Sequence, residues 1–278
     1  MLADTSYGKS GVRLVQVIRH GEHHEVRDLT VSIRFEGHYD ASYTAGDNSE
    51  VLPTDTMKNT VYALAAGGSI DQPERFALQL AGHFIARNPR LQRVTIGITE
   101  HLWGRIRVGD REHGQAFVGR GPELRTASVV MDRQRTDISA GIADLLILKS
   151  SHSAFSGFPR DGFTTLPETR DRLLATALTA TWTYDGEAVS FGTAWQAVRR
   201  ALLESFATHD SESVQHTLHA IGEEVLGTVP EVSSIRIVMP NRHHLPVDLA
   251  KFGLENRNEI FVATTEPYGL IEATIRRR

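Results

Sequence analysis

The stretch "LPTDTMKNTVYALAA" (residues 52–66) contains residue types that suit both a helix start and a bound anion. Thr54 and Asp55 come just before the apolar positions of a predicted helix, and the Thr54 hydroxyl is placed to cap backbone N–H groups that otherwise lack partners. The same N–H groups attract negatively charged ligands. Thr54 is therefore either only a helix cap or a residue that faces a substrate.

Other polar and aromatic residues lie at the ends of predicted elements, where functional residues tend to gather. Lys9 lies in "SYGKSG", just before the first predicted strand, and Phe155 lies in the loop "SSHSAFSGF". Arg172 lies in "LPETRDRLL", where Pro167 predicts a helical turn. The remaining candidates are Val214 and Gln215 in the first turn of a helix, and Asn241 and His243 after a strand that ends at Pro240. Taken singly, each has a simpler explanation as a solvated charge, a core aromatic or a structural histidine.

Metal and nucleotide motifs find no support in the sequence. The pairs His23–His24 and His243–His244 are adjacent, and neighbouring residues of a strand point to opposite faces, so neither pair forms a natural two-ligand site. The "GRG" at 119–121 lacks the rest of a dinucleotide or phosphate-loop fingerprint, and no Gly-x-Ser-x-Gly elbow occurs. We therefore predict no metal site.

Composition narrows the class of protein. The chain has 278 residues, of which 40% are hydrophobic and 23% charged, enough to form one large domain or two of about 130 residues each. A net charge of −4 offers no general attraction to nucleic acid, and the chain contains no cysteine for disulfides or thiolate chemistry. No apolar run approaches the roughly 18 residues of a membrane helix, and the start lacks the features of a secretory signal. We expect a cytoplasmic protein.

Hydrophobic patterning predicts two halves with the same order of elements. In the first half, strands are predicted at 12–20, 26–37, 93–108 and 126–138, with one short helix after Thr54 and another helix at 72–89. Residues 26–37 alternate apolar and polar side chains, which predicts a strand with one buried face and one solvent-exposed face. The helix at 72–89 places Phe76, Leu80 and Phe84 at steps of four.

The second half repeats this order. Strands are predicted at 141–150, 177–185, 233–240 and 259–266, and helices at 191–210 and 211–227. Each half is then predicted to form an antiparallel sheet with two helices on one face. The other face of the sheet and the unpaired edges of its outer strands would be exposed to solvent unless another element or chain packs against them. Association of several copies would cover both, so we predict an oligomer with an active site at a subunit junction.

A set of short motifs, in this order, resembles the urate oxidase (uricase) family. The motifs are "YGK" (7–9), "TDTMKNTVYALA" (54–65), "FSGFPRDGFTTLPETRDR" (155–172), "SVQ" (213–215) and "PNRHH" (240–244). The resemblance spans nearly the whole chain. It implies an α+β fold made of two tandem tunnelling-fold (T-fold) halves, at 1–138 and 139–278, in a homotetramer with a central tunnel.

The same resemblance implies the activity and its residues. The family oxidises urate with O2 and water, without a cofactor, to 5-hydroxyisourate and hydrogen peroxide. Its catalytic relay falls on Lys9, Thr54 and His243. Its substrate-binding groups fall on Thr54, Asp55, Phe155, Arg172, Val214, Gln215 and Asn241. The lysine and the helix-start residues are expected from a neighbouring subunit.

Two departures and two alternatives accompany the resemblance. The chain ends in "IRRR" rather than the peroxisomal Ser-Lys-Leu of many eukaryotic members, which favours a bacterial-type cytoplasmic protein, and Arg170 stands where some relatives have an aromatic residue. The enzymatic alternative is a pterin-handling enzyme of the same fold, and the non-enzymatic one is a urate-binding protein without catalysis. The Arg172–Gln215 pair fits a purine anion better than a pterin.

Overall fold

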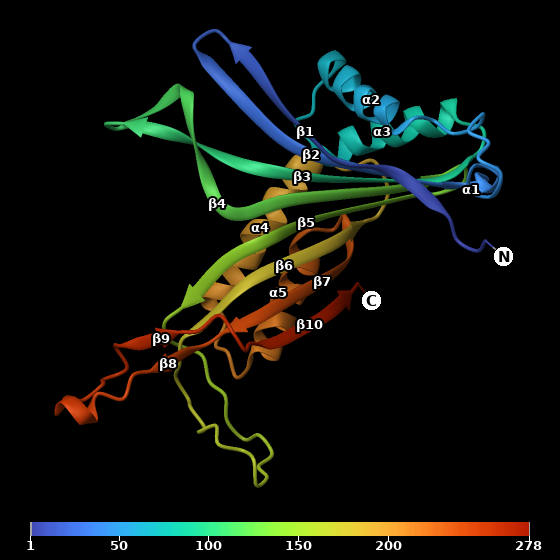
Figure 1. Ribbon diagram of the computed structural model, residues 1–278. Coiled ribbons are helices and arrows are strands. Elements are labelled where there is room, and N and C mark those ends of the chain that lie inside the picture. The colour runs from blue at the N-terminus through green and yellow to red at the C-terminus, as the bar shows by residue number, and fades with distance from the viewer. Residues whose placement is uncertain (1, 278) are drawn as a thin grey trace. The chain divides into compact units, whose positions relative to one another are not determined.

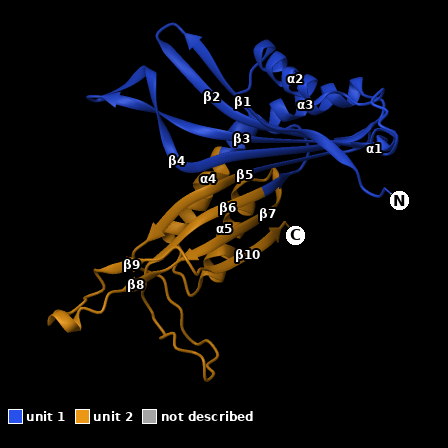
Figure 2. Cartoon of the chain, viewed as in Figure 1, with its two compact units in different colours: residues 1–141, 182–195 blue, residues 142–181, 196–278 orange. Residues whose placement is uncertain are grey.

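The computed structural model describes residues 2–277; Met1 and Arg278, which belong to the two terminal segments interpreted above, lie outside the described residues. The chain forms two compact units, one of residues 1–141 with 182–195 and the other of residues 142–181 with 196–278 (Figure 2). Strands β5 (Thr136–Lys149) and β6 (Leu174–Tyr184) run through both units. The division of the sequence into halves at 138/139 stays a prediction.

The first unit is an antiparallel sheet with helices on one face (Figure 1). Its elements are β1 (Ser6–His20), β2 (His23–Gly37), β3 (Leu91–Val108) and β4 (Arg111–Asp132), with helices α1 (Asp40–Thr44), α2 (Thr54–Gly67) and α3 (Pro73–Arg87). Neighbouring strands pair in the order β1-β2-β3-β4. Helix α3 packs on β3 and β4, and α2 packs on β1.

The sheet and α3 share one apolar core, as their patterns predict. Leu29, Val31, Ile33 and Phe35 of β2 are almost completely buried, and so are the residues at steps of four along α3. The Phe35 and Phe84 rings meet edge to face with their centroids 5.1 Å apart. Burial of such large side chains, at about 25 cal/mol per Å² of apolar surface, is the main force that holds α3 on the sheet.

The second unit repeats the arrangement. It contains β7 (Val232–Arg242) and β10 (Gly269–Arg276), with α5 (Val214–Thr228) packed on both and α4 (Phe191–Thr208) entering from the first unit. Gly222 of α5 faces Ile275 of β10, and a Cβ there would lie 2.6 Å from the isoleucine Cδ1. The predicted α+β architecture, an antiparallel sheet with helices on one face, is confirmed in both units.

Two predicted strands are wrong. The strand expected at 126–138 contains a turn, because the Asp132 carboxylate accepts hydrogen bonds from the amides of Gln134 and Arg135 (2.7 and 2.8 Å) and reverses the chain into β5. The strand expected at 259–266 is only β9 (Phe261–Ala263), which pairs with β8 (His244–Pro246) in a separate hairpin with a 3₁₀ turn at Ala250–Phe252. The edge strand beside β7 is instead β10.

Among the described residues, none of the helices combines the length and apolar character needed to cross a bilayer.

A buried charge cluster ties α3 to the sheet of the first unit. Arg125 on β4 donates from Nη2 to Glu74 Oε2 on α3 at 2.7 Å, and its Nη1 lies 3.7 Å from Glu100 Oε2 on β3. The guanidinium also lies 5.3 Å from the ring centroid of Trp195. Burial raises the pKa of both glutamates, although the Arg125 charge opposes the rise. The native state therefore depends on the Arg125 charge to offset the cost of burying the Glu74 and Glu100 carboxyl groups.

The substitution Arg125→Met should lower the free energy of unfolding by roughly 3 kcal/mol or more, because it leaves a buried carboxylate without its partner. Urea denaturation of the variant measures the loss. The double variant Glu74→Gln/Arg125→Met should lose less than Arg125→Met alone. As a control, Arg135→Met breaks an exposed pair with Asp137 and should change stability by less than about 1 kcal/mol. Equal losses in the single and double variants would contradict the assignment.

Candidate functional site

A cavity of about 320 Å³ in the second unit collects several of the predicted site residues. This volume falls in the range of small-molecule sites. Its wall is formed by the segment 155–173, the end of β7 and the base of the β8–β9 hairpin. Phe155, Arg172, Asn241 and His243 all line it. The structure thus brings together four predicted residues from three separate stretches of the chain.

Arg172 lies beside an aromatic ring and keeps a free donor. Its guanidinium carbon is 5.2 Å from the ring centroid of Phe155. Its Nε is buried and has no hydrogen-bond partner among the described residues. Burial lowers the pKa of Arg172, but a guanidinium keeps its charge at any physiological pH. A buried donor without a partner is costly, so this N–H is suited to a ligand acceptor.

The predicted helical turn at 166–174 is wrong, because backbone pairing holds this segment extended. The amide of Phe155 donates to Thr169 O at 2.8 Å, and the amide of Thr169 donates back to Phe155 O at 3.0 Å. The amide of Arg172 donates to Ser153 O at 2.9 Å. These bonds bring Arg172 to the loop that carries Phe155.

The start of α5 is attached to the same loop. The amide of Ala154 donates to Ser211 O at 2.7 Å, and Ser153 and Ser211 form a parallel bridge. The Ser213 hydroxyl caps α5 by accepting from the His216 amide at 3.1 Å. Val214 and Gln215 therefore do fall in the first helical turn, as predicted, but neither belongs to the wall of the cavity. Val214 as a whole residue is 3% exposed, and its side chain belongs to the core.

Asn241 lies inside β7 and not after it. The strand was predicted to end at Pro240, yet the ladder with β10 continues through the pairs Pro240–Leu270 and Asn241–Gly269. Asn241 is consequently 9% exposed and firmly placed. His243 follows the strand, and its carbonyl accepts the amide of Thr264 at 2.9 Å. The pairing partner, which the local sequence does not show, decides where this strand ends.

The remaining predicted residues lie together in the first unit. Lys9 is within β1, opposite Ile33, and not before the strand as predicted. Its neighbour Gly8 is required there, because a Cβ would lie 1.9 Å from Ile33 O. The Tyr7 hydroxyl accepts the Leu52 amide at 3.1 Å, so β1 is bound to the segment that leads into α2.

Thr54 opens α2 but does not cap it, so the capping prediction is wrong. Pro53 occupies the cap position, and its carbonyl accepts the Met57 amide at 3.2 Å without a side-chain cap. The Thr54 hydroxyl is thereby released from capping. The Lys58 ammonium, which bonds the Asp55 carboxylate, lowers the pKa of Asp55, with smaller contributions from Asn59 and Lys9. Lys9 and the start of α2 therefore share one neighbourhood.

Several wall residues of the cavity were missed by sequence reasoning. They are Leu166, Pro167, Glu168, Thr169, Asp171, Leu173, His244, Leu245, Pro246, Asn258 and Phe261. Asn258 has a positive φ of 65°, which no local pattern predicts. Most of the other wall residues lie within the motifs 155–172 and 240–244 that were quoted from the sequence. Treating every residue of these two motifs as a candidate would have found them.

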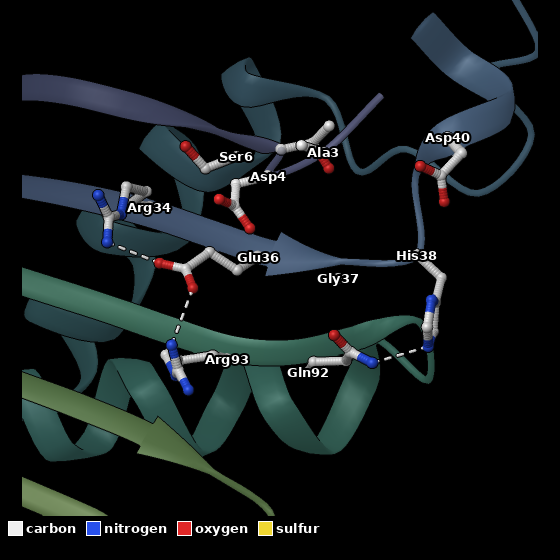
Figure 3. A pocket seen from close by; sticks show the side chains of 11 residues that line it. Ala3, Asp4, Ser6, Arg34, Glu36, Gly37, His38, Asp40, Gln92 and Arg93 are labelled. Carbon is white, nitrogen blue, oxygen red and sulfur yellow. Dashed lines mark hydrogen bonds and ion pairs between the residues drawn. The ribbon is translucent and has the colours of Figure 1, made fainter. Parts of the chain in front are cut away.

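A larger hollow of about 560 Å³ lies in the first unit and suits a ligand less well (Figure 3). Its two arginines are already paired, since the Glu36 carboxylate binds Arg34 at 2.6 Å and Arg93 at 3.1 Å. Asp4 and Asp40 add further negative charge. Figure 3 shows Glu36 joined to both Arg34 and Arg93, whereas Asp40 lies apart from them on the side of His38. The smaller cavity is therefore the better candidate.

Comparison with known proteins finds relatives that match almost the whole chain. The family model described as uricase matches residues 5–130 and 138–272. The curated uricase of Arthrobacter globiformis is 43% identical over 277 residues, which cover 100% of this chain and 90% of that protein. The uricase of Danio rerio is 36% identical and is covered over 94% of its length.

Solved structures give the same result. The crystal structure of the Arthrobacter globiformis uricase superimposes with a TM-score of 0.95 over 100% of this chain and 95% of the other. The urate oxidase of Bacillus sp. TB-90, at 25% identity, superimposes with a TM-score of 0.85 over 99% and 100% of the two chains. With a family model that covers nearly every described element and relatives that match from end to end, the chain belongs to the uricase family.

Proposed function

We propose that this chain oxidises urate with O2 and water to 5-hydroxyisourate and hydrogen peroxide. The observation that carries the proposal is the cavity in which the Arg172 guanidinium, with an unpartnered Nε–H, lies beside the Phe155 ring. Urate is a flat monoanion at neutral pH, and an aromatic face beside a fixed cation is suited to such a molecule. Membership of the uricase family supports the same reaction.

Four of the proposed substrate-binding groups, which all belong to the second unit, hold neighbouring edges and one face of urate. Arg172 presents planar donors to a carbonyl and an adjacent ring nitrogen on one edge of urate. Gln215 both donates and accepts, so it binds the neighbouring edge, where a carbonyl stands beside an N–H. The Val214 amide at the start of α5 adds a donor where negative charge is favoured. Phe155 stacks on the ring and holds its plane.

The reaction needs a source of single electrons, because triplet O2 reacts slowly with closed-shell molecules. Doubly deprotonated urate is electron-rich enough to supply them, so the protein has to remove a proton, hold O2 and admit water. Two electrons pass from urate to O2, which leaves as H2O2, and the oxygen of water becomes the 5-hydroxyl group. We propose that no cofactor takes part.

The proton relay is assigned to Lys9, Thr54 and His243. The Thr54 hydroxyl links the lysine to the substrate, and it is available because Pro53, not Thr54, is the N-cap residue of α2. Asn241, held inside the β7–β10 ladder, positions O2 and then water above the ring. Asp55 contributes its backbone N–H at the start of α2, because its carboxylate is already bonded to Lys58 and Asn59.

The working enzyme is a cytoplasmic homotetramer with each site completed by two subunits. Lys9, Thr54 and Asp55 belong to the first compact unit, and Phe155, Arg172, Gln215 and Asn241 belong to the second. In a symmetric pair of chains, the first unit of one subunit and the second unit of its partner form one site, and the reciprocal pair forms another.

The direct test of function follows urate absorbance and peroxide release together. Purified protein treated with a metal chelator should consume urate and O2 and release H2O2 in equal amounts, because the electrons come from the substrate itself. Untreated protein is the control. Loss of all activity on chelation, with recovery on adding one metal, would overturn the cofactor-free reaction.

Substitutions at the two ends of the site should have different kinetic effects. Arg172→Ala should raise KM by about 10- to 100-fold, since a hydrogen bond to a charged group contributes about 1.5–3 kcal/mol. Lys9→Met should lower kcat by about 100-fold or more with a smaller change in KM, as expected for a lost proton-transfer group. Steady-state kinetics separate the two. An unchanged kcat in Lys9→Met would remove the lysine from the relay.

Mixing the two variants, assayed at urate well below the wild-type KM where each has lost most of its activity, tests whether sites are shared. Refolding Lys9→Met with Arg172→Ala in equal amounts should restore about a quarter of the wild-type activity, because half of the subunit pairs are mixed and each mixed pair has one intact site. Each variant refolded alone is the control. If the mixture is no more active than its components, each site is built within one chain.

A further inference from the structure

His152 has a backbone conformation that is unusual for its residue type. Its φ is +58°, in the left-handed region that most side chains avoid, although histidine enters it more often than bulky residues do. Such a conformation costs of the order of 1 kcal/mol or more and persists only where surrounding bonds fix it. His152 stands three residues before Phe155, at the turn that leads into the cavity wall.

Three hydrogen bonds fix this turn, and together they reach two other parts of the chain. The His152 amide donates to Asp171 Oδ1 at 2.9 Å. The His152 carbonyl accepts the Ser211 amide at 3.1 Å. The His152 ring is bonded through Nδ1 to Asp210 Oδ1 at 2.8 Å. One residue thus connects its own loop to the 169–172 segment and to the segment that enters α5.

Each of these segments carries a proposed substrate contact. Asp171 immediately precedes Arg172, whose guanidinium meets the Phe155 ring. Residues 210–213 lead directly into Val214 and Gln215. The connection continues beyond His152, because the Ser153 carbonyl accepts the Arg172 amide and the Ala154 amide donates to Ser211 O. Movement at His152 would therefore shift the purine-stacking ring, the guanidinium and the helix start relative to one another.

Global stability does not explain the ring contact. The side chains of His152 and Asp210 are 73% and 83% exposed, and exposed pairs contribute about 0–1 kcal/mol. Asp171 already receives the His152 amide and the Ser151 hydroxyl, so the loop has a stronger attachment to its own neighbour. The ring contact instead joins the two attachments, so it fixes the binding groups relative to one another before the ligand arrives, which lowers the entropic cost of binding.

We propose that His152 is a positioning residue for purine binding, which sets the Phe155 ring, the Arg172 guanidinium and the start of α5 in one fixed arrangement. The proposal rests on the assignment of Phe155, Arg172, Val214 and Gln215 as substrate contacts under the proposed function. His152 itself touches no substrate. Its contribution is to hold three contacts at fixed distances.

The test uses His152→Gly in the full-length enzyme. Glycine adopts the same φ without strain, so the backbone turn is kept while the ring bond to Asp210 is lost. KM for urate, and the Kd of a non-oxidisable purine analogue, should rise about three- to tenfold, with kcat changed less than about twofold and the melting temperature within a few degrees of wild type. Asp210→Asn should weaken analogue binding less, and adding it to His152→Gly should have no further effect.

Two controls make the result specific. His152→Asn, which tolerates the left-handed region and keeps a polar side chain directed at Asp210, should recover part of the lost affinity. Glu272→Gln breaks an exposed pair with Arg236 in the same unit, whose side chains are 50% and 52% exposed, and should leave KM and Kd unchanged.

The outcomes separate this proposal from the proposed function. Unchanged KM and Kd in His152→Gly would overturn the positioning role and leave urate oxidation intact. A rise in KM that merely accompanies a large fall in melting temperature would also overturn it, since the residue would then be structural. Wild-type protein that fails to oxidise urate, or Arg172→Ala with unchanged analogue affinity, would instead refute the assigned site.

Discussion

The backbone hydrogen bonds that join residues 152–155 to Thr169–Arg172 and to Ser211 determine what the second unit can bind. These bonds lie outside the regular sheet, yet they hold an aromatic ring, a guanidinium and a helix start beside one cavity. A loop fixed on two sides loses little further freedom when a flat ligand arrives, which reduces the entropic cost of binding. The regular elements serve mainly as anchors for this irregular region.

The two units solve different physical problems with the same architecture. The first unit contains a buried arginine between two glutamates, together with a strand that approaches its neighbour closely at Gly8. The charge cluster ties α3 to the sheet, and the close approach at Gly8 holds the strand that carries Lys9 against β2. The second unit contains the cavity and leaves Arg172 Nε without a partner among its described residues. The proposed shared site needs both features. A reactive group has to be held in a rigid frame, which the first unit supplies. A binding group needs a donor that a ligand can satisfy, which the second unit supplies.

Much of the fold could be predicted from local pattern, and most errors involve partners that the pattern does not contain. Phe76, Leu80 and Phe84 are buried as their spacing predicts, since a helix carries its own periodicity. The end of β7 and the identity of its edge neighbour depend on β10, which lies about 30 residues further along the chain. The predicted cap at Thr54 is wrong by one residue, since the cap position is Pro53. Proline and threonine both suit a helix start, so the sequence does not distinguish between them. For the site, the motifs indicated the candidate residues, whose roles stay predictions, whereas the pairing of 169–172 with the Phe155 loop needed the structure.

Gly8 has a consequence for attempts to redesign this protein. Any side chain at this position would collide with Ile33 O, so β1 would have to move away from β2 and would carry Lys9 with it. Strand packing and the placement of the Lys9 ammonium group, which we propose belongs to the proton relay, therefore depend on the same missing atom. A library of variants at residue 8, selected for better expression, would also change the position of Lys9. Expression and the position of Lys9 could therefore not be optimised separately.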